Sequence, residues 1–147
     1  MDDFSPLILE LEHNDARRRQ RALDEIAALG EAAIPMLRRA LNLGHGAARP
    51  QAAEALAQIG PAAVSALDEA LSDPDPEARL WAVWTLSRID HPSVTPLLRS
   101  ALTDVALHVR RQAVEGLAAS SDPAAVPALC RVLTDADSNL RQEAAEA

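Results

Sequence analysis

Aromatic side chains are scarce in this sequence of 147 residues, which has no tyrosine, one phenylalanine and two tryptophans. A core must therefore be built from Ala, Leu, Ile and Val, and this alanine- and leucine-rich composition favours helices. The single cysteine, Cys130, excludes a disulfide framework and a cysteine-based metal site. No run of about 18 apolar residues is present, so the sequence predicts no membrane-spanning helix.

Positive charge is also in deficit, because 14 Lys and Arg stand against 22 Asp and Glu, a formal net charge of −8. That balance disfavours nucleic acid and anionic membranes as partners, since both attract an excess of cationic groups. The chain begins Met-Asp-Asp and lacks the basic region and apolar run of a signal peptide. We therefore expect a cytoplasmic protein.

Motifs that carry catalysis are missing as well. The sequence has no glycine-rich phosphate loop and no nucleophile motif. The histidines fall in predicted turns or helix ends, and no two share a helix at metal-ligand spacing. We expect no enzymatic activity, no metal and no cofactor.

What the sequence does contain is a repeat. Arginines recur at spacings of 30, 30, 31 and 31 residues: Arg19, Arg49, Arg79, Arg110 and Arg141. Three residues after each arginine stands an alanine: Ala22, Ala52, Ala82, Ala113 and Ala144. Eight residues before each arginine stands a leucine: Leu11, Leu41, Leu71, Leu102 and Leu133. A fixed period of this length indicates a repeat architecture.

Each unit is predicted to form two helices, a short one and a longer one. In the third unit the longer helix is expected over residues 76–89, with Asp75 as its N-cap and Pro76 in its first turn. Gly30 and Gly60 follow longer helices and suit the position after a helix end. Neither helix can bury its apolar face alone, so stacked pairs with a continuous core are expected.

The repeat resembles the HEAT-repeat family, in the bacterial subclass similar to phycobilisome-lyase HEAT-like repeats. An early proline, a turn aspartate and an arginine six residues later carry the resemblance: Pro35, Pro96, Pro127; Asp73, Asp104, Asp135; Arg79, Arg110, Arg141. The first two units depart from it, with His13 and Leu43 at the aspartate position. The resemblance implies an all-α, right-handed α-α superhelix in which the second helix of each pair lines the concave side.

The resemblance covers one domain, residues 1–147, with about five helix pairs. The repeats are expected over residues 4–30, 31–60, 61–90, 91–121 and 122–147. The last helix stops at Ala147, before the next apolar residue of the pattern, and the sequence leaves open whether the chain is part of a longer repeat protein.

The arginine column could be read as a phosphate-binding row, but the acidity of the chain favours a structural role. From Arg79 onward each arginine has an aspartate six residues earlier, and we expect a ladder of pairs that ties adjacent turns together: Asp73 with Arg79, Asp104 with Arg110 and Asp135 with Arg141.

Deoxyhypusine hydroxylases resemble this fold and carry His-Glu pairs directly after the repeat arginine. The corresponding positions here hold other residues: Pro50-Gln51, Leu80-Trp81, Arg111-Gln112 and Gln142-Glu143. The iron ligands of that family are absent, so its activity is not expected.

Both tryptophans fall on the predicted concave surface of the middle repeat. Leu80, Trp81 and Trp84 lie one, two and five residues after Arg79, at positions expected to face solvent. The same positions in other repeats are mostly polar, among them Asp24, Glu54, Arg111, Gln112 and Glu115. An aromatic patch with a charged rim is typical of a binding site, here for a protein or peptide with basic residues. The alternative is that the rings pack down over small neighbours and thicken the core.

The sequence favours a non-enzymatic interaction scaffold that binds a protein or peptide on its concave face. The alternative is an accessory factor or lyase-like protein that handles a chromophore or assembles a cofactor enzyme, as in the bilin-lyase group. Nucleic-acid binding, as in HEAT-like DNA glycosylases, needs a basic groove and is disfavoured by the acidic row. The partner, the pathway and the oligomeric state are not encoded in any motif.

Overall fold

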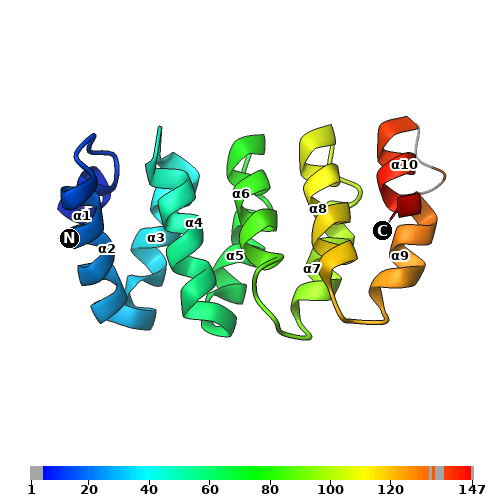
Figure 1. The fold of residues 1–147 in the computed structure, drawn as a ribbon, viewed down its shortest axis with the longest axis horizontal. Helices are drawn as coiled ribbons and strands as arrows, with labels where there is room; N and C mark the ends of the chain where they lie inside the picture. Colours follow the sequence, from blue (N-terminus) through cyan, green and yellow to red (C-terminus); the bar gives the residue numbers. More distant parts are fainter. Residues whose placement is uncertain (1–4, 133, 135–137, 147) are drawn as a thin grey trace.

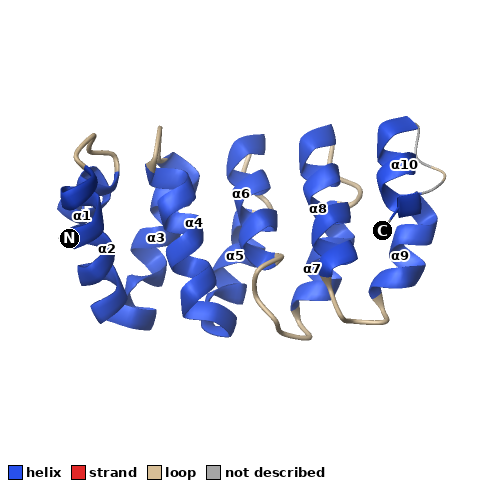
Figure 2. Cartoon of the chain, in the orientation of Figure 1, coloured by secondary structure: helices blue, strands red, loops and turns tan. Residues whose placement is uncertain are grey.

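A computed structural model describes residues 5–132, 134 and 138–146, and in these residues it contains ten α-helices, two short 3-10 helices and no strand (Figure 2). The first helices of the pairs are α1 (Ser5–Leu11), α3 (Ile34–Leu43), α5 (Val64–Ala70), α7 (Val94–Ala101) and α9 (Ala125–Val132). The second helices are α2 (Ala16–Leu29), α4 (Ala48–Ile59), α6 (Pro76–Leu86), α8 (Leu107–Ala119) and α10 (Ser138–Glu146). The expected all-α repeat fold is confirmed, and each expected repeat range holds one helix pair.

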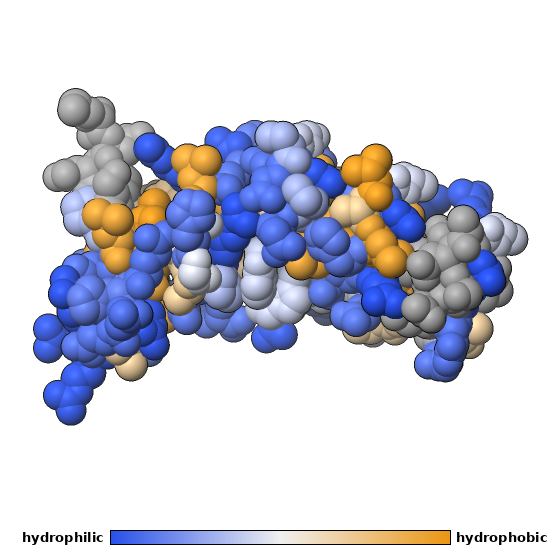
Figure 3. Space-filling view, turned by 90° about the horizontal axis from the view of Figure 1, so that it is seen from above, coloured by the Kyte–Doolittle hydropathy of each residue, from blue (hydrophilic) through white to orange (hydrophobic). Residues whose placement is uncertain are grey.

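The pairs follow one another along the long axis, with the chain ends at opposite ends of the molecule (Figure 1). Second helices pack on second helices, as α4 does on α6 and α6 on α8, and first helices pack on first helices, as α3 does on α5. Seen from above, the outline bows inward along its lower edge, which is the side of the second helices (Figure 3). The second helices therefore form a shallowly concave layer. None of the described helices has the length and apolar character needed to cross a membrane.

Local signals set the helix ends. The Asp15 carboxylate caps α2 and the Asp75 carboxylate caps α6. Each accepts a hydrogen bond from the backbone N–H group two residues further along the chain. Gly30 and Gly60 end α2 and α4 with φ of 55° and 79°, a conformation that side chains disfavour. Helix α6 ends at Leu86 rather than at the expected residue 89, because the chain turns there and the Ser87 hydroxyl donates to the Trp84 carbonyl at 2.6 Å.

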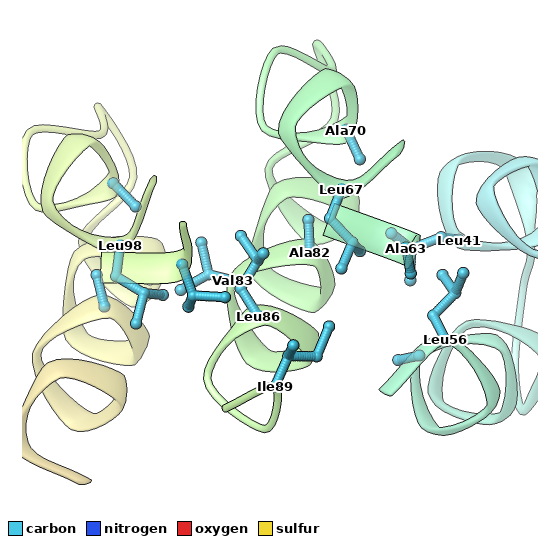
Figure 4. Close-up of a cluster of buried hydrophobic side chains, with 14 of the residues drawn as sticks. Leu41, Leu56, Ala63, Leu67, Ala70, Ala82, Val83, Leu86, Ile89 and Leu98 are labelled. Carbon is cyan, nitrogen blue, oxygen red and sulfur yellow. The ribbon is translucent and has the colours of Figure 1, made fainter. Parts of the chain in front are cut away.

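The core lies between the two helix layers and is built from small and aliphatic side chains (Figure 4). Ala82, Val83 and Leu86, three, four and seven residues after Arg79, are each 0% exposed. The expected core register of the second helix is therefore confirmed. Alanine at the closest approach of the helices leaves no room for aromatic rings, which explains their scarcity.

One glycine sets the spacing between the third and fourth repeats. A Cβ at Gly116 of α8 would lie 2.8 Å from Ser87 Cβ and 3.2 Å from Leu98 Cδ1. Alanine is the better helix former by up to about 1 kcal/mol, but overpacking costs about 1–3 kcal/mol.

We expect Gly116→Ala to destabilise the protein by about 1 kcal/mol net, measured as the shift of the urea unfolding midpoint. Ala118→Gly, on the exposed face of the same helix, measures the propensity contribution by itself. A Gly116→Ala variant as stable as the wild type would mean that α8 and α6 can move apart freely.

The arginine ladder has a different pairing from the one expected. Arg79 Nη1 donates to the backbone carbonyls of Asp73 and Pro74 in its own turn, at 2.9 and 3.2 Å. Its Nε and Nη2 donate to the two carboxylate oxygens of Asp104, in the next repeat, at 2.7 and 2.9 Å. The expected side-chain pair of Asp73 with Arg79 is therefore wrong.

Arg49 has both kinds of partner, and Arg110 has the backbone carbonyl of its own turn. Arg49 binds the Asn42 carbonyl at 3.0 Å and the Asp75 carboxylate of the next repeat. Arg110 Nη1 donates to the backbone carbonyl of Asp104 at 2.9 Å, so the expected pair of Asp104 with Arg110 involves the main chain and not the carboxylate.

The carboxylate of the aspartate six residues before Arg79 or Arg110 does not pair with that arginine, because it binds the backbone of its own turn. An Asp in such a turn accepts a hydrogen bond from the N–H two residues on, as Asp73 does from Asp75 and Asp104 from Ala106. Arg49 and Arg79 therefore join successive repeats rather than closing each one, and a structural role for the whole column stays a prediction. Asp135 lies outside the described residues, so its pair with Arg141 stays a prediction.

The Arg79–Asp104 pair predicts a pH effect. The hydrogen bonds from Arg79 hold the pKa of Asp104 below its ordinary value, against the opposing effect of burial. A carboxyl whose pKa is lower in the folded state stabilises at neutral pH and loses that contribution as pH falls below about 4.

We therefore expect the stability difference between the wild type and Asp104→Asn to shrink on acidification from about pH 7 to about pH 3. Unfolding midpoints of both proteins across this range provide the measurement. A difference that stays constant with pH would show that the ionised carboxylate contributes nothing.

Candidate partner-binding surface

The two tryptophans form one aromatic pair on α6 in the middle repeat. The ring centroids of Trp81 and Trp84 are 5.5 Å apart with an interplanar angle of 66°, an edge-to-face arrangement. Both rings and the neighbouring Leu80 are half-buried and pack against the core cluster. The expectation that these residues simply face solvent needs correction, because α4 and α8 flank α6 and leave only a strip of it exposed.

A residue that sequence reasoning missed lies on this pair. Arg88 places its guanidinium carbon 4.8 Å from the centroid of the Trp84 ring, and its Nε lies 3.8 Å from Glu54 Oε2 on α4. The chain's own cation therefore occupies the face of Trp84 that was expected to meet a partner's cation. Arg88 follows Trp84 by four residues, a spacing at which helical side chains meet, and that signal could have identified it.

Two predicted acidic residues line one cleft. Asp24 on α2 and Glu54 on α4 border a hollow of about 450 Å³ between these helices. The remaining lining residues are amides, aliphatic side chains and one glycine: Gln20, Leu23, Ile26, Ala27, Gly30, Ala55, Gln58 and Ile59. In the described structure Asp24 accepts a hydrogen bond from Gln20 Nε2 at 2.9 Å and forms no ion pair.

The three predicted residues of the fourth repeat lie apart from this cleft. Arg111 and Gln112 are half-buried on α8, and Glu115 is exposed on the same helix. Helix α8 packs on α6 as α4 does, so these residues stand on a different flank of α6 from Glu54. Asp24 and Glu54 share a cleft, and Glu54, Arg88, Trp84 and Trp81 form a continuous contact chain.

The chemistry of this surface is that of recognition. It offers an aromatic pair covered by Arg88, a second arginine at Arg111, and the carboxylates of Asp24, Glu54 and Glu115. Among the described residues no group of three or more His, Cys, Asp or Glu side chains is arranged to hold a metal ion.

Comparisons with known proteins agree with this architecture. A family model of HEAT repeats matches residues 64–147, and a model of the PBS lyase HEAT-like repeat matches residues 48–73. No curated protein is significantly similar to the chain in sequence.

Solved structures resemble the chain over nearly its whole length. The complex of CpcE and CpcF of phycocyanin lyase from Nostoc sp. PCC7120 matches with a TM-score of 0.69 and 22% identity, covering 96% of this chain and 95% of that chain. Human deoxyhypusine hydroxylase matches with a TM-score of 0.65 and 21% identity, covering 98% of this chain and 60% of that one. A designed armadillo repeat protein in complex with the peptide (KR)4 matches with a TM-score of 0.54 and 19% identity, covering 97% and 79%. At these identities the likeness shows the fold alone.

Proposed function

Because the chain belongs to the HEAT-repeat family, we propose that it is a non-enzymatic interaction module that binds an extended segment of a protein partner across α2, α4 and α6. The layer of second helices offers a shallowly concave surface, and repeat proteins use such surfaces for extended ligands.

The tryptophan pair carries this proposal. Trp81 and Trp84 are the only tryptophans of the chain, and both keep part of their surface exposed at the centre of the concave layer. Tryptophan is enriched among the residues that dominate binding energies, especially at the centre of an interface. The rings also pack on the core, which holds them rigid before a partner arrives and lowers the entropic cost of binding. We assign the apolar anchor of the partner to these rings.

The charge around the pair favours a basic partner segment. Asp24, Glu54 and Glu115 lie on the three second helices α2, α4 and α8, and the net charge of −8 attracts cations at long range. Arg88 opposes a second cation directly over Trp84. The basic groups of the partner are therefore expected to lie beside the aromatic anchor rather than on it.

Intrinsic fluorescence tests the proposal directly, since every tryptophan signal of this protein comes from the patch. Peptides selected on the immobilised protein from a random display library are expected to change tryptophan emission on titration. A matched control is Val126→Ser, which alters an apolar residue 60% exposed on α9, a first helix. Selected peptides that bind without changing the emission, or whose affinity falls in Val126→Ser, would refute this surface.

A lyase-like accessory role is the second candidate, favoured by the match of residues 48–73 to the PBS lyase HEAT-like repeat. Aromatic rings can stack on a planar chromophore. Titration with an open-chain tetrapyrrole would then give a saturable shift of its visible absorption band and quench both tryptophans. An unchanged absorption spectrum at saturating protein would remove this candidate.

A further inference from the structure

One cleft in the layer of second helices lies between α2 and α4. In Figure 1 the two helices lie side by side, with α3 visible between them. The hollow of about 450 Å³ is within the range of ~300–1,000 Å³ that is usual for ligand pockets. Its walls come from two successive repeats, so its width depends on the size of the side chains at the equivalent positions of those repeats.

The repeat register explains why this groove is lined by short side chains, whereas an aromatic and a cationic side chain occupy part of the next one. Glu54 and Gln58 stand five and nine residues after Arg49 on α4. The same positions in the third repeat hold Trp84 and Arg88, which are larger. Between α4 and α6 the indole and the guanidinium stack on each other and reach Glu54, whereas between α2 and α4 the shorter side chains leave space.

The lining has an apolar floor and an acidic rim. Ile26 and Ala55 are 1% and 9% exposed and form the base, with half-buried Leu23 and Ile59 beside them. Asp24 and Glu54 stand on opposite walls, and no lysine or arginine lines the cleft. This arrangement suits a ligand with an aliphatic stem and a cationic end.

We propose that the α2–α4 cleft binds an arginine side chain of the partner segment. The stem of the arginine would lie along Leu23 and Ile59, and its planar guanidinium would donate to the carboxylates of Asp24 and Glu54. Arginine fits better than lysine because its fork of five N–H donors can reach acceptors on both walls and is weakly hydrated. The assignment rests on the proposed function, since the arginine belongs to the same partner.

The position of the cleft also relates it to the aromatic anchor. A second hollow, of about 400 Å³, continues from Glu54 and Gln58 to Ser87 and Arg88, next to Trp84. A segment that places an arginine between α2 and α4 can therefore extend over α4 to the tryptophan pair. Arg88 repels a cation at Trp84. Within the cleft Glu54 already has Arg88 at 3.8 Å, whereas Asp24 forms no ion pair in the described structure, so Asp24 is the freer acceptor.

The test uses a probe that needs no partner. N-acetyl-arginine methylamide is titrated into the isotope-labelled protein, and backbone amide NMR shifts are followed, with the citrulline analogue as the neutral isostere. We expect saturable shifts at Leu23, Asp24, Ala27, Ala55 and Gln58. The citrulline analogue should bind with an affinity about fivefold lower than that of the arginine probe, since two exposed ion pairs are lost.

Two double variants distinguish binding by the carboxylates of the cleft from a general effect of the protein's negative charge. Asp24→Asn/Glu54→Gln removes both carboxylates of the cleft and should abolish the preference for arginine over citrulline. Glu25→Gln/Asp68→Asn removes two exposed charges outside the cleft and should preserve it. Equal binding of arginine and citrulline, shifts centred on other helices, or equal effects of the two double variants would overturn the proposal.

The outcome is distinguishable from failure of the proposed function. If selected peptides bind at the tryptophan pair but the arginine probe does not bind in the cleft, the proposed interaction module is supported and the proposed arginine pocket is wrong. If the probe binds the cleft but no peptide alters tryptophan emission, the pocket stands and the aromatic anchor is wrong.

Discussion

Arg79→Ala is expected to lower the free energy of unfolding by about 3 kcal/mol, because it removes one partner of a largely buried ion pair. Arg79 is 9% exposed and donates to the Asp104 carboxylate and to the Asp73 and Pro74 carbonyls. The truncation leaves the Asp104 carboxylate without its cation and the two carbonyls without their donor. Chemical unfolding of the variant measures the loss directly.

A double-mutant cycle identifies the partner. Arg79→Ala combined with Asp104→Ala should give a coupling energy on the order of 1–3 kcal/mol. The matched cycle of Arg110→Ala with Asp104→Ala should give a smaller value, because Arg110 is bonded to the Asp104 main-chain carbonyl, which the alanine variant keeps. A larger coupling energy for Asp104 with Arg110 than with Arg79 would contradict the pairing in the structure and support the pair of Asp104 with Arg110 expected from the spacing.

Truncating both rings, in Trp81→Ala/Trp84→Ala, should affect folding and binding together. The sequence pattern predicts that folding survives, since neither ring stands at a core position. The structure changes that expectation, because both rings pack on the core cluster and on each other. We expect a loss of about 3 kcal/mol in stability, at the lower end for buried aromatics because these rings are half-buried. Loss of the aromatic anchor should also weaken peptide binding by about 2 kcal/mol, roughly 30-fold.

The two effects are separated by measuring affinity per folded molecule at a temperature well below the unfolding midpoint. Trp81→Leu/Trp84→Leu is the matched control, because it keeps apolar volume against the core while removing the aromatic faces. A lowered midpoint with unchanged affinity per folded molecule would assign the rings to folding alone.

Helix pairs, core positions and caps could be predicted because they depend on local patterns. The spacing of Leu41, Arg49 and Leu56 is a property of one repeat, and apolar residues three and four apart must share a helix face. The cap at Asp75 follows in the same way, since its carboxylate accepts a hydrogen bond from the Glu77 N–H two residues later and this contact is local. The five-fold recurrence of such patterns in the sequence was enough to indicate the solenoid.

Contacts between repeats were decided by tertiary structure. The sequence places Asp73 and Asp104 at equal distances before Arg79 and Arg110, yet Arg79 pairs with the aspartate 25 residues further along. Arg88 reaches Glu54 of the preceding repeat, and the α2–α4 cleft is open, because α4 packs more extensively on α6 than on α2. Each of these outcomes depends on the offset and angle between stacked pairs. That geometry arises from side-chain volumes on two helices at once, so no pattern within a single repeat contains it.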